Sequence, residues 1–229
     1  MTPMLDTLRL KRAFRRLNRE LEGIRPDLSG ADLLNFVYSK PGSLITPWQY
    51  REEVEQLVAE LEKLKPARAL EIGTANGGTL FLLCRLAESD ARIMSIDLPE
   101  GKFGGGYPEW KIPMYHRFAT SDQELELLRG DSHRLETLQR VETFFQKEEL
   151  DYLFIDGDHS YEGVKQDYEM YSPLVRKGGL IVFHDIVEHP DSDCQVDRYW
   201  HEVKEGKNYK EFVRDWEQGK YGIGLIIKD

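Results

Sequence analysis

The sequence predicts an α/β fold built on a mostly parallel, doubly wound β-sheet. Short apolar runs alternate with segments whose apolar residues recur at helical spacing, which is the pattern of strands joined by crossover helices. Such crossovers are almost always right-handed. Glycine-rich and acidic segments directly follow the apolar runs. Because ligands of open parallel sheets bind outside the carboxyl ends of the strands, these segments are the first place to look for a site.

Composition excludes several classes of protein. The 229 residues are 40% hydrophobic and 31% charged, which is typical of a globular chain, with one domain as the default. The 31 basic and 41 acidic residues leave a net charge of −10, which opposes nucleic acid or an anionic membrane as a partner. No apolar run approaches the roughly 20 residues of a membrane-spanning helix, and the N-terminus lacks the apolar core of a secretory signal. A cytoplasmic location is therefore predicted.

The first predicted element is an amphipathic helix over residues 4–24, where apolar residues recur at helical spacing. A looser stretch follows, punctuated by prolines and glycines between residues 26 and 42. The segment Thr46-Pro47-Trp48-Gln49 then has the form of a capping box with proline at the first helical position. A second helix is predicted to begin there and to end at Lys65, because Pro66 follows.

Apolar runs predict five strands, at residues 67–72, 92–96, 124–128, 152–155 and 180–183. Beyond them, residues 195–206 are predicted to form a helix. Two further strands, at 210–215 and 222–227, are predicted to pair around Gln218-Gly219 as an antiparallel addition to one edge of the sheet. The irregular span 98–113 is glycine-rich and contains Phe103, Tyr107 and Trp110. A loop of this length indicates a lid or binding segment, with a plain surface insertion as the alternative.

A glycine-rich turn follows the first strand, in the segment Glu71-Ile72-Gly73-Thr74-Ala75-Asn76-Gly77-Gly78. Its glycines let a ligand approach the backbone, and the following helix offers free N–H groups, so a nucleotide-like ligand fits there. Ala75 stands where the dinucleotide fingerprint requires its second glycine, which disfavours NAD. A tight structural turn is the alternative interpretation.

Acidic residues follow the next two strands. Asp97 ends the second strand, where a carboxylate can accept both hydroxyls of a ribose. After the third strand, Asp131 and Ser132 suit the edge of an adenine, although they can equally cap the next helix. Together with Glu71 these carboxylates predict an acidic cleft, which favours a donor bearing a sulfonium and an ammonium over a pyrophosphate.

The fourth and fifth strands end in Asp156 and in His184-Asp185. If the two strands are neighbours, about 4.8 Å apart, the aspartates meet at the mouth of the sheet and repel unless a proton or a cation lies between them. A divalent ion such as Mg²⁺, with His184 as a possible third ligand, resolves this repulsion, although imidazole suits zinc, nickel or iron better. The alternative for His184 is a structural histidine hydrogen-bonded at the strand end.

His159 lies three residues after Asp156 and is the candidate base, because a histidine can take up a proton near neutral pH. The remaining histidines are expected to be ungrouped. The two cysteines, Cys84 and Cys194, are too few and too far apart for a disulfide framework or a zinc-ligand set. They are interpreted as bystanders.

Five segments resemble the class I S-adenosylmethionine-dependent methyltransferases, particularly the cephalosporin-hydroxylase-like and metal-dependent O-methyltransferase branch. The segments are LEIGTANGG, IMSIDLPEG, LRGDS, LDYLFIDGDHSYEGVKQDY and LVRKGGLIVFHDI. The resemblance spans about residues 46–229 and implies a Rossmann-like seven-stranded sheet in the order 3-2-1-4-5-7-6, with the last strand antiparallel and helices on both faces. Residues 1–45, which match nothing recognisable, are expected to be a helical cap or a dimer contact, so a homo-oligomer is expected.

The resemblance implies S-adenosylmethionine as cofactor and Mg²⁺ as metal. The expected donor-binding residues are Glu71, Gly73, Thr74, Asn76, Gly77, Gly78, Asp97, Asp131, Ser132 and Asp156. The expected metal ligands are Asp156, His184 and Asp185, and the expected catalytic residues are His159 and Asp156. The chain departs from the pattern at His184, where metal-dependent relatives often carry an acid.

The implied function is transfer of a methyl group to a hydroxyl of a small molecule, such as a sugar or a natural product. Two alternatives remain. The glycine turn and Asp97 also suit a nicotinamide-dependent oxidoreductase. A catalytically silent adenosyl-binding or assembly protein would keep the cleft without the chemistry.

Overall fold

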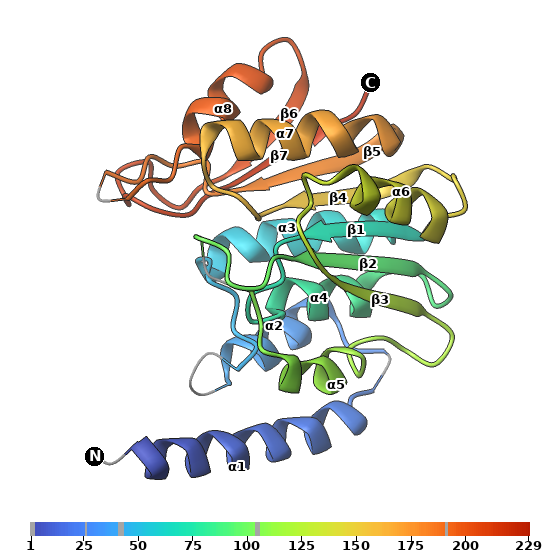
Figure 1. The fold of residues 1–229 in the computed structure, drawn as a ribbon, viewed down its shortest axis with the longest axis vertical. Helices are drawn as coiled ribbons and strands as arrows, with labels where there is room; N and C mark the ends of the chain where they lie inside the picture. The colour runs from blue at the N-terminus through green and yellow to red at the C-terminus, as the bar shows by residue number, and fades with distance from the viewer. Residues whose placement is uncertain (1–2, 26, 41–43, 104–105, 191) are drawn as a thin grey trace.

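A computed structural model of the protein describes residues 3–25, 27–40, 44–103, 106–190 and 192–229, with the backbone alone for residues 3–11. Its centre is one seven-stranded sheet in the order β3-β2-β1-β4-β5-β7-β6 (Figure 1). The strands are β1 (Arg68–Ile72), β2 (Arg92–Asp97), β3 (Glu124–Arg129), β4 (Leu150–Ile155), β5 (Val175–His184), β6 (Asn208–Phe212) and β7 (Ile223–Ile227). Strands β1 to β5 pair in parallel, and β7 is antiparallel to both β5 and β6. The predicted fold class and strand order are therefore confirmed.

Helices cover both faces of the sheet. They are α1 (Pro3–Glu22), α2 (Gly30–Tyr38), α3 (Arg51–Leu64), α4 (Gly78–Leu86), α5 (Ile112–Tyr115), α6 (Leu135–Phe144), α7 (Tyr161–Tyr171) and α8 (Val196–Val203), with short 3₁₀ turns η2 (Glu109–Lys111) and η3 (Ser172–Leu174). In Figure 1, α6 and α7 cross in front of the sheet, and α3 and α4 lie behind it. Successive strand residues point to opposite faces, so Ala69 packs into the core under α3 and α4, and Leu70 into the core under α6 and α7.

Two expectations for the N-terminal third are wrong. The stretch from 26 to 42 contains the helix α2, which begins with a capping box made by Ser29 and Asp32. A Cβ on Gly30 would lie 2.4 Å from Val58, so the glycine serves close packing of α2 on α3 and does not break a helix. The helix α3 begins at Arg51, not at Thr46, because the Thr46 hydroxyl donates to the carbonyl of Val37 in α2.

The N-terminal helix α1 lies at the end of the molecule beyond α5 (Figure 1). Leu17 and Leu21 on its inner face are buried, and the Phe14 ring packs edge-on against Trp110 at 5.0 Å. The interpretation of residues 1–45 as a cap or dimer contact remains a prediction. Among the residues that the structure describes, no helix combines the length and hydrophobicity needed to cross a bilayer.

The connection between β6 and β7 is longer than the turn expected around Gln218-Gly219, and a buried carboxylate ties it to α3. Glu53 of α3 accepts hydrogen bonds from the backbone N–H groups of Arg214 and Gly222 and from the Gln218 amide, at 3.3, 3.1 and 2.7 Å. β6 consequently ends at Phe212, where the sequence indicated a strand to 215.

Replacing Glu53 by alanine is expected to lower the free energy of unfolding by about 3 kcal/mol, because three hydrogen-bond donors lose their acceptor in a buried place. Urea denaturation measures this loss. Glu52→Ala, at the exposed neighbouring position of the same helix, is the matched control and is expected to change stability by less than about 0.5 kcal/mol. Equal effects of the two substitutions would contradict the role of Glu53.

Candidate active site

Two adjoining cavities lie at the carboxyl ends of the central strands. The smaller one, of about 100 Å³, is bounded by the ends of β1, β2 and β4. The larger one, of about 370 Å³, extends toward the end of β5 and the β6–β7 connection. Ala75, Phe103 and Asp156 line both. Of the three aromatic residues named in the span 98–113, only Phe103 lines either cavity. Tyr107 is buried in the core, and Trp110 packs on α1.

The glycine turn after β1 brings two strand ends close together. Gly73 has a φ of +91°, and a Cβ there would lie 1.9 Å from the carbonyl oxygen of Asp156. The turn is anchored on both sides, because the Gly73 N–H donates to Ile96 at 2.8 Å and the Asp156 N–H donates to Ile72 at 2.8 Å. Gly73 lines the smaller cavity, and Thr74, Asn76, Gly77 and Gly78 line the larger one.

Asp97 sits in the smaller cavity and organises the turn. Its Oδ2 accepts the backbone N–H groups of Thr74 and Ala75, at 2.9 and 2.8 Å. Burial raises the pKa of Asp97, although these two hydrogen bonds oppose the shift. Asp131 and Ser132 line the same cavity, and Asp131 Oδ1 accepts the His133 N–H at 2.9 Å. The structure therefore brings these three expected donor-binding residues together.

Glu71 is placed differently from the other acids. It is 1% exposed, is not part of the lining of either cavity, and accepts a hydrogen bond from the Ser95 hydroxyl at 3.1 Å. Burial raises the pKa of Glu71 to about 8. At neutral pH this side chain therefore adds little negative charge, and the acidic side chains that line the smaller cavity are Asp97, Asp131, Asp156 and Asp158.

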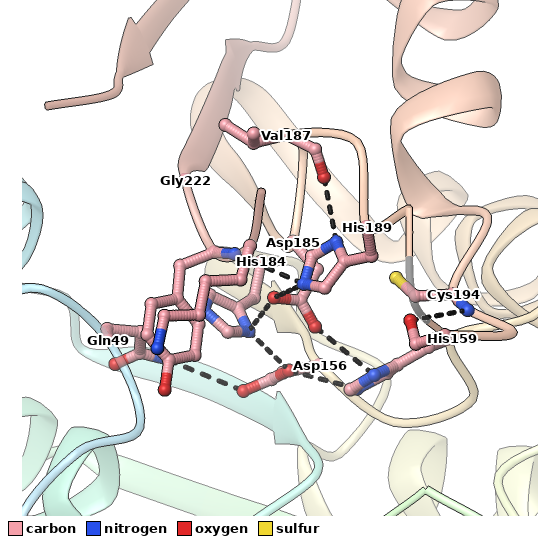
Figure 2. Close-up of polar contacts among 12 residues, drawn as sticks. Gln49, Asp156, His159, His184, Asp185, Val187, His189, Cys194 and Gly222 are labelled. Carbon is pink, nitrogen blue, oxygen red and sulfur yellow. Dashed lines mark hydrogen bonds and ion pairs between the residues drawn. The ribbon is translucent and has the colours of Figure 1, made fainter. Parts of the chain in front are cut away.

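The ends of β4 and β5 form a dense polar cluster on the rim of the larger cavity (Figure 2). His184 Nδ1 lies 2.9 Å from Asp156 Oδ1 and 3.3 Å from Asp185 Oδ1. His159 bridges the same two carboxylates, with Nε2 3.3 Å from Asp156 Oδ1 and Nδ1 3.1 Å from Asp185 Oδ2. The predicted meeting of the two aspartates is therefore found. Asp185 has a φ of +63°, a strained conformation for a residue with a side chain.

Opposite charges in this cluster outweigh the burial of its members. Burial alone would raise the pKa of Asp156 and Asp185, but the adjacent histidines hold the pKa of Asp156 below and of Asp185 well below the usual range. Burial alone would lower the pKa of His184 and His159, but the two carboxylates raise it. The two histidines thus lie between the aspartates, and their attraction for the carboxylates offsets the predicted repulsion.

Three members of the site were missed by the sequence interpretation. His189, expected to be ungrouped, has Nε2 3.2 Å from Asp185 Oδ1 and Nδ1 2.8 Å from the carbonyl of Val187 (Figure 2). Cys194, interpreted as a bystander, lines the larger cavity. Gln49, expected inside a helix, is buried there with its amide nitrogen 3.5 Å from Asp156 Oδ2. The four-residue spacing of Asp185 and His189 was the one available signal.

Two other side chains near the smaller cavity were also missed. His133 Nε2 lies 3.3 Å from Asp167, whose side chain is fully buried in α7, so the expectation of an ungrouped His133 is wrong. Lys111 is 8% exposed, and its ammonium donates to the Asn76 side chain at 3.2 Å. Burial lowers the pKa of Lys111 to about 8.

A family model described as a methyltransferase domain matches residues 70–186 of the chain. The uncharacterised protein y4gI of Sinorhizobium fredii is 28% identical over 143 residues, which are 61% of this chain and 15% of the relative. The uncharacterised protein R132 of Acanthamoeba polyphaga mimivirus is 39% identical over 72 residues, which are 31% of this chain and 28% of the relative. The matches therefore span less than a third of the length of these curated relatives.

Solved structures with the same fold include an O-methyltransferase from Bacillus cereus in complex with S-adenosylhomocysteine. It is 19% identical, with a TM-score of 0.58 over 90% of this chain and 93% of that chain. The O-methyltransferase TomG from Streptomyces achromogenes, in complex with S-adenosylmethionine, is 18% identical, with a TM-score of 0.57 over 90% and 92% of the two chains. At this identity the likeness establishes the fold.

Proposed function

Because the chain belongs to the methyltransferase domain family, we propose that it transfers a methyl group from S-adenosylmethionine to a hydroxyl of a small molecule, such as a sugar or a natural product. One observation carries the proposal. An acidic cavity adjoins a larger cavity lined by His159 and two further histidines, and Asp156 lines both. A cationic donor in the first cavity and a hydroxyl in the second would meet at that residue.

The successive parts of S-adenosylmethionine occupy adjoining regions of the two cavities. Asp97 accepts the ribose hydroxyls, and Asp131 and Ser132 lie beside the adenine. The amino-acid part extends along the turn at Asn76, where the buried ammonium of Lys111 offers a counter-charge for the donor carboxylate. The sulfonium lies near Asp156, whose lowered pKa keeps it negatively charged.

In the transfer step, the acceptor oxygen attacks the methyl carbon in line with the carbon–sulfur bond. A carbon–oxygen bond forms as the carbon–sulfur bond breaks, and S-adenosylhomocysteine leaves with the electron pair on sulfur. The hydroxyl proton passes to neutral His159, whose Nε2–H donates to Asp156 and whose Nδ1, on the side of Asp185, accepts the proton. Phe103 stacks on the His159 ring at 5.1 Å and excludes water from one side. In-line positioning of this kind supplies much of the rate.

The resemblance implies Mg²⁺ at Asp156, His184 and Asp185, whose donor atoms all lie within 4.8 Å of one another. Mg²⁺ requires a near-octahedral shell of oxygens. Here His184 directs a nitrogen at the two carboxylates, at 2.9 and 3.3 Å, where an acid would supply an oxygen. The residues present do not fit Mg²⁺, so the mechanism proposed for this chain contains no step through it.

Calorimetric titration with S-adenosylhomocysteine tests donor binding. Asp97→Asn is expected to weaken binding by about 10-fold to 100-fold, because a hydrogen bond to a charged group contributes roughly 1.5–3 kcal/mol. Asp90→Asn removes a charge from an exposed position and is expected to leave affinity unchanged. Repeating the titration with excess Mg²⁺ is expected to leave the affinity for S-adenosylhomocysteine unchanged, because the donor set disfavours that ion.

The same titration separates the alternatives. Tighter binding of NAD than of S-adenosylhomocysteine would favour the oxidoreductase and contradict the proposal. Binding of S-adenosylhomocysteine without methyl transfer to any of a panel of hydroxylated sugars and phenols would favour the catalytically silent protein.

A further inference from the structure

We propose that His159, Asp185 and Cys194 form a thiolate-containing site for a borderline divalent cation of the Zn²⁺ class, and that a cation bound there withholds His159 from the reaction. The metal site stands on the geometry of these three side chains. Only its inhibitory consequence rests on the proposed function.

Three different donor types converge on the larger cavity from separate segments. His159 comes from the turn after β4, Asp185 from the end of β5, and Cys194 from the segment before α8 (Figure 2). One ligand atom of each lies within 4.8 Å of the others. In a tetrahedral zinc site, bond lengths of about 2.0–2.3 Å place ligand atoms roughly 3.3–3.6 Å apart. A small inward movement of the side chains therefore satisfies the geometry.

A backbone contact ties the segments of Cys194 and His159 together without a metal. The Gln195 N–H donates to the His159 carbonyl at 2.7 Å, which ties the residue after Cys194 to the turn after β4. The Cys194 N–H donates to the Ser192 hydroxyl at 3.2 Å. Because the ligands are brought together by the fold, little ordering is required when a cation binds.

The neighbouring groups suit the second shell of such a site. His159 directs Nδ1 at Asp185, 3.1 Å away, so this nitrogen is the ligand, and Nε2 lies 3.3 Å from Asp156 Oδ1. A carboxylate that holds the far nitrogen of a ligating histidine fixes its orientation and raises its basicity. His189 Nε2 lies 3.2 Å from Asp185 Oδ1 and so fixes the orientation of the ligating carboxylate.

The donor set determines which cations bind. A thiolate and an imidazole select Zn²⁺, Co²⁺ and similar ions over Mg²⁺, which prefers oxygen ligands. The three protein ligands leave a fourth position for water, facing the cavity. A cation coordinated by His159 Nδ1 occupies the imidazole lone pair, so that this histidine no longer accepts the acceptor's proton.

Titration of the full chain with Co²⁺, followed by absorption spectroscopy, tests the site. A thiolate-to-cobalt charge-transfer band is expected with the intense visible bands of tetrahedral Co²⁺. Zn²⁺ is expected to displace Co²⁺ and so to remove these bands, whereas Mg²⁺ is expected to leave them unchanged.

Cys194→Ser is expected to abolish the charge-transfer band and to weaken Zn²⁺ binding at least tenfold, measured by competition with a chromophoric chelator. Cys84→Ser, a substitution in the core, and His201→Ala, at an exposed position of α8, are the controls and are expected to keep both properties.

Thiol labelling of the unmodified chain provides a second measurement that does not depend on the folding of a variant. Cys194 is partly accessible and Cys84 is buried, so a disulfide reagent is expected to label one thiol rapidly. Stoichiometric Zn²⁺ is expected to protect that thiol, and excess Mg²⁺ is not. Absence of a charge-transfer band, Zn²⁺ affinity unchanged in Cys194→Ser, or labelling unaffected by Zn²⁺ would each overturn the proposed site.

Donor binding and methyl transfer separate the two proposals. Binding of S-adenosylhomocysteine without a thiolate–cobalt band would support the proposed function and contradict the metal site. A thiolate–cobalt band without binding of S-adenosylhomocysteine would support the metal site and contradict the proposed function. If both hold, Zn²⁺ is expected to inhibit methyl transfer in the wild type, and the Zn²⁺ concentration for half inhibition is expected to rise at least tenfold in Cys194→Ser.

Discussion

Replacing His159 by glutamine is expected to lower kcat of methyl transfer by about 100-fold or more and to leave the affinity for S-adenosylhomocysteine within about twofold. A positioned base typically contributes a factor of 10² to 10⁴. Glutamine keeps a hydrogen-bonding side chain of similar reach between Asp156 and Asp185 but cannot take up the hydroxyl proton. Steady-state kinetics and calorimetric titration measure the two effects.

The control for this substitution is His201→Gln, at an exposed position of α8, which is expected to leave both quantities unchanged. A wild-type kcat in His159→Gln would show that His159 is not the base of the reaction. A parallel loss of donor affinity would instead indicate a structural role.

The pH dependence of kcat/KM reports on the same group. Burial alone would lower the pKa of His159, but the hydrogen bond to Asp156 and the charges of Asp156 and Asp185 raise it above its usual value. Because the base must be neutral, activity is expected to fall as the pH decreases through this raised pKa, on the alkaline side of about 6.5. In Asp156→Asn the pKa of His159 decreases, so the acid limb of the profile is expected to move to lower pH.

Replacing Gly73 by alanine is expected to lower the free energy of unfolding by roughly 4 kcal/mol or more and to abolish donor binding. The φ of +91° is strained for any residue with a Cβ, and the added carbon would lie 1.9 Å from the carbonyl oxygen of Asp156. Relief of that overlap requires the ends of β1 and β4 to separate, which opens both cavities. At about 2–4 °C per kcal/mol for a chain of this size, Tm falls by roughly 10 °C.

Gly206→Ala is the matched control. Gly206 also has a positive φ, +71°, but a Cβ there would meet nothing within 4 Å. Its cost is the backbone strain alone, about 1 kcal/mol. Equal changes in Tm for the two substitutions would show that the close approach of β1 and β4 is not what requires Gly73.

Several features of this protein could be predicted because they depend on residues near one another in the chain. The alternation of apolar runs and helical segments predicted the parallel sheet. The strand ends at Asp97, Asp156 and His184-Asp185 were found within a residue, because a polar residue after a buried run marks where the strand leaves the core. Parallel strands expose their carboxyl ends on one edge, so these residues were expected to share a site.

Other features depended on contacts between distant segments. Thr46 and Gln49 match a capping box, but the Thr46 hydroxyl instead bonds to α2, and Gln49 instead reaches Asp156, 107 residues later in the chain. Gly30 was interpreted as part of a loop, but it begins α2 and allows that helix to pack closely against Val58 of α3. Glu71 was expected from the sequence to bind the donor. Its burial raises the pKa of its carboxyl group to about 8, so that it contributes little negative charge at neutral pH.

The order of apolar and polar residues alone therefore determined the α/β architecture and the edge of the sheet that carries the site, because backbone periodicity and strand burial are local properties. Tertiary structure alone decided which further side chains join these residues, above all that His189 and Cys194 lie beside Asp185. No spacing rule encodes the contact with Cys194, since the segment before α8 is tied to the turn after β4 by the hydrogen bond from the Gln195 N–H to the His159 carbonyl.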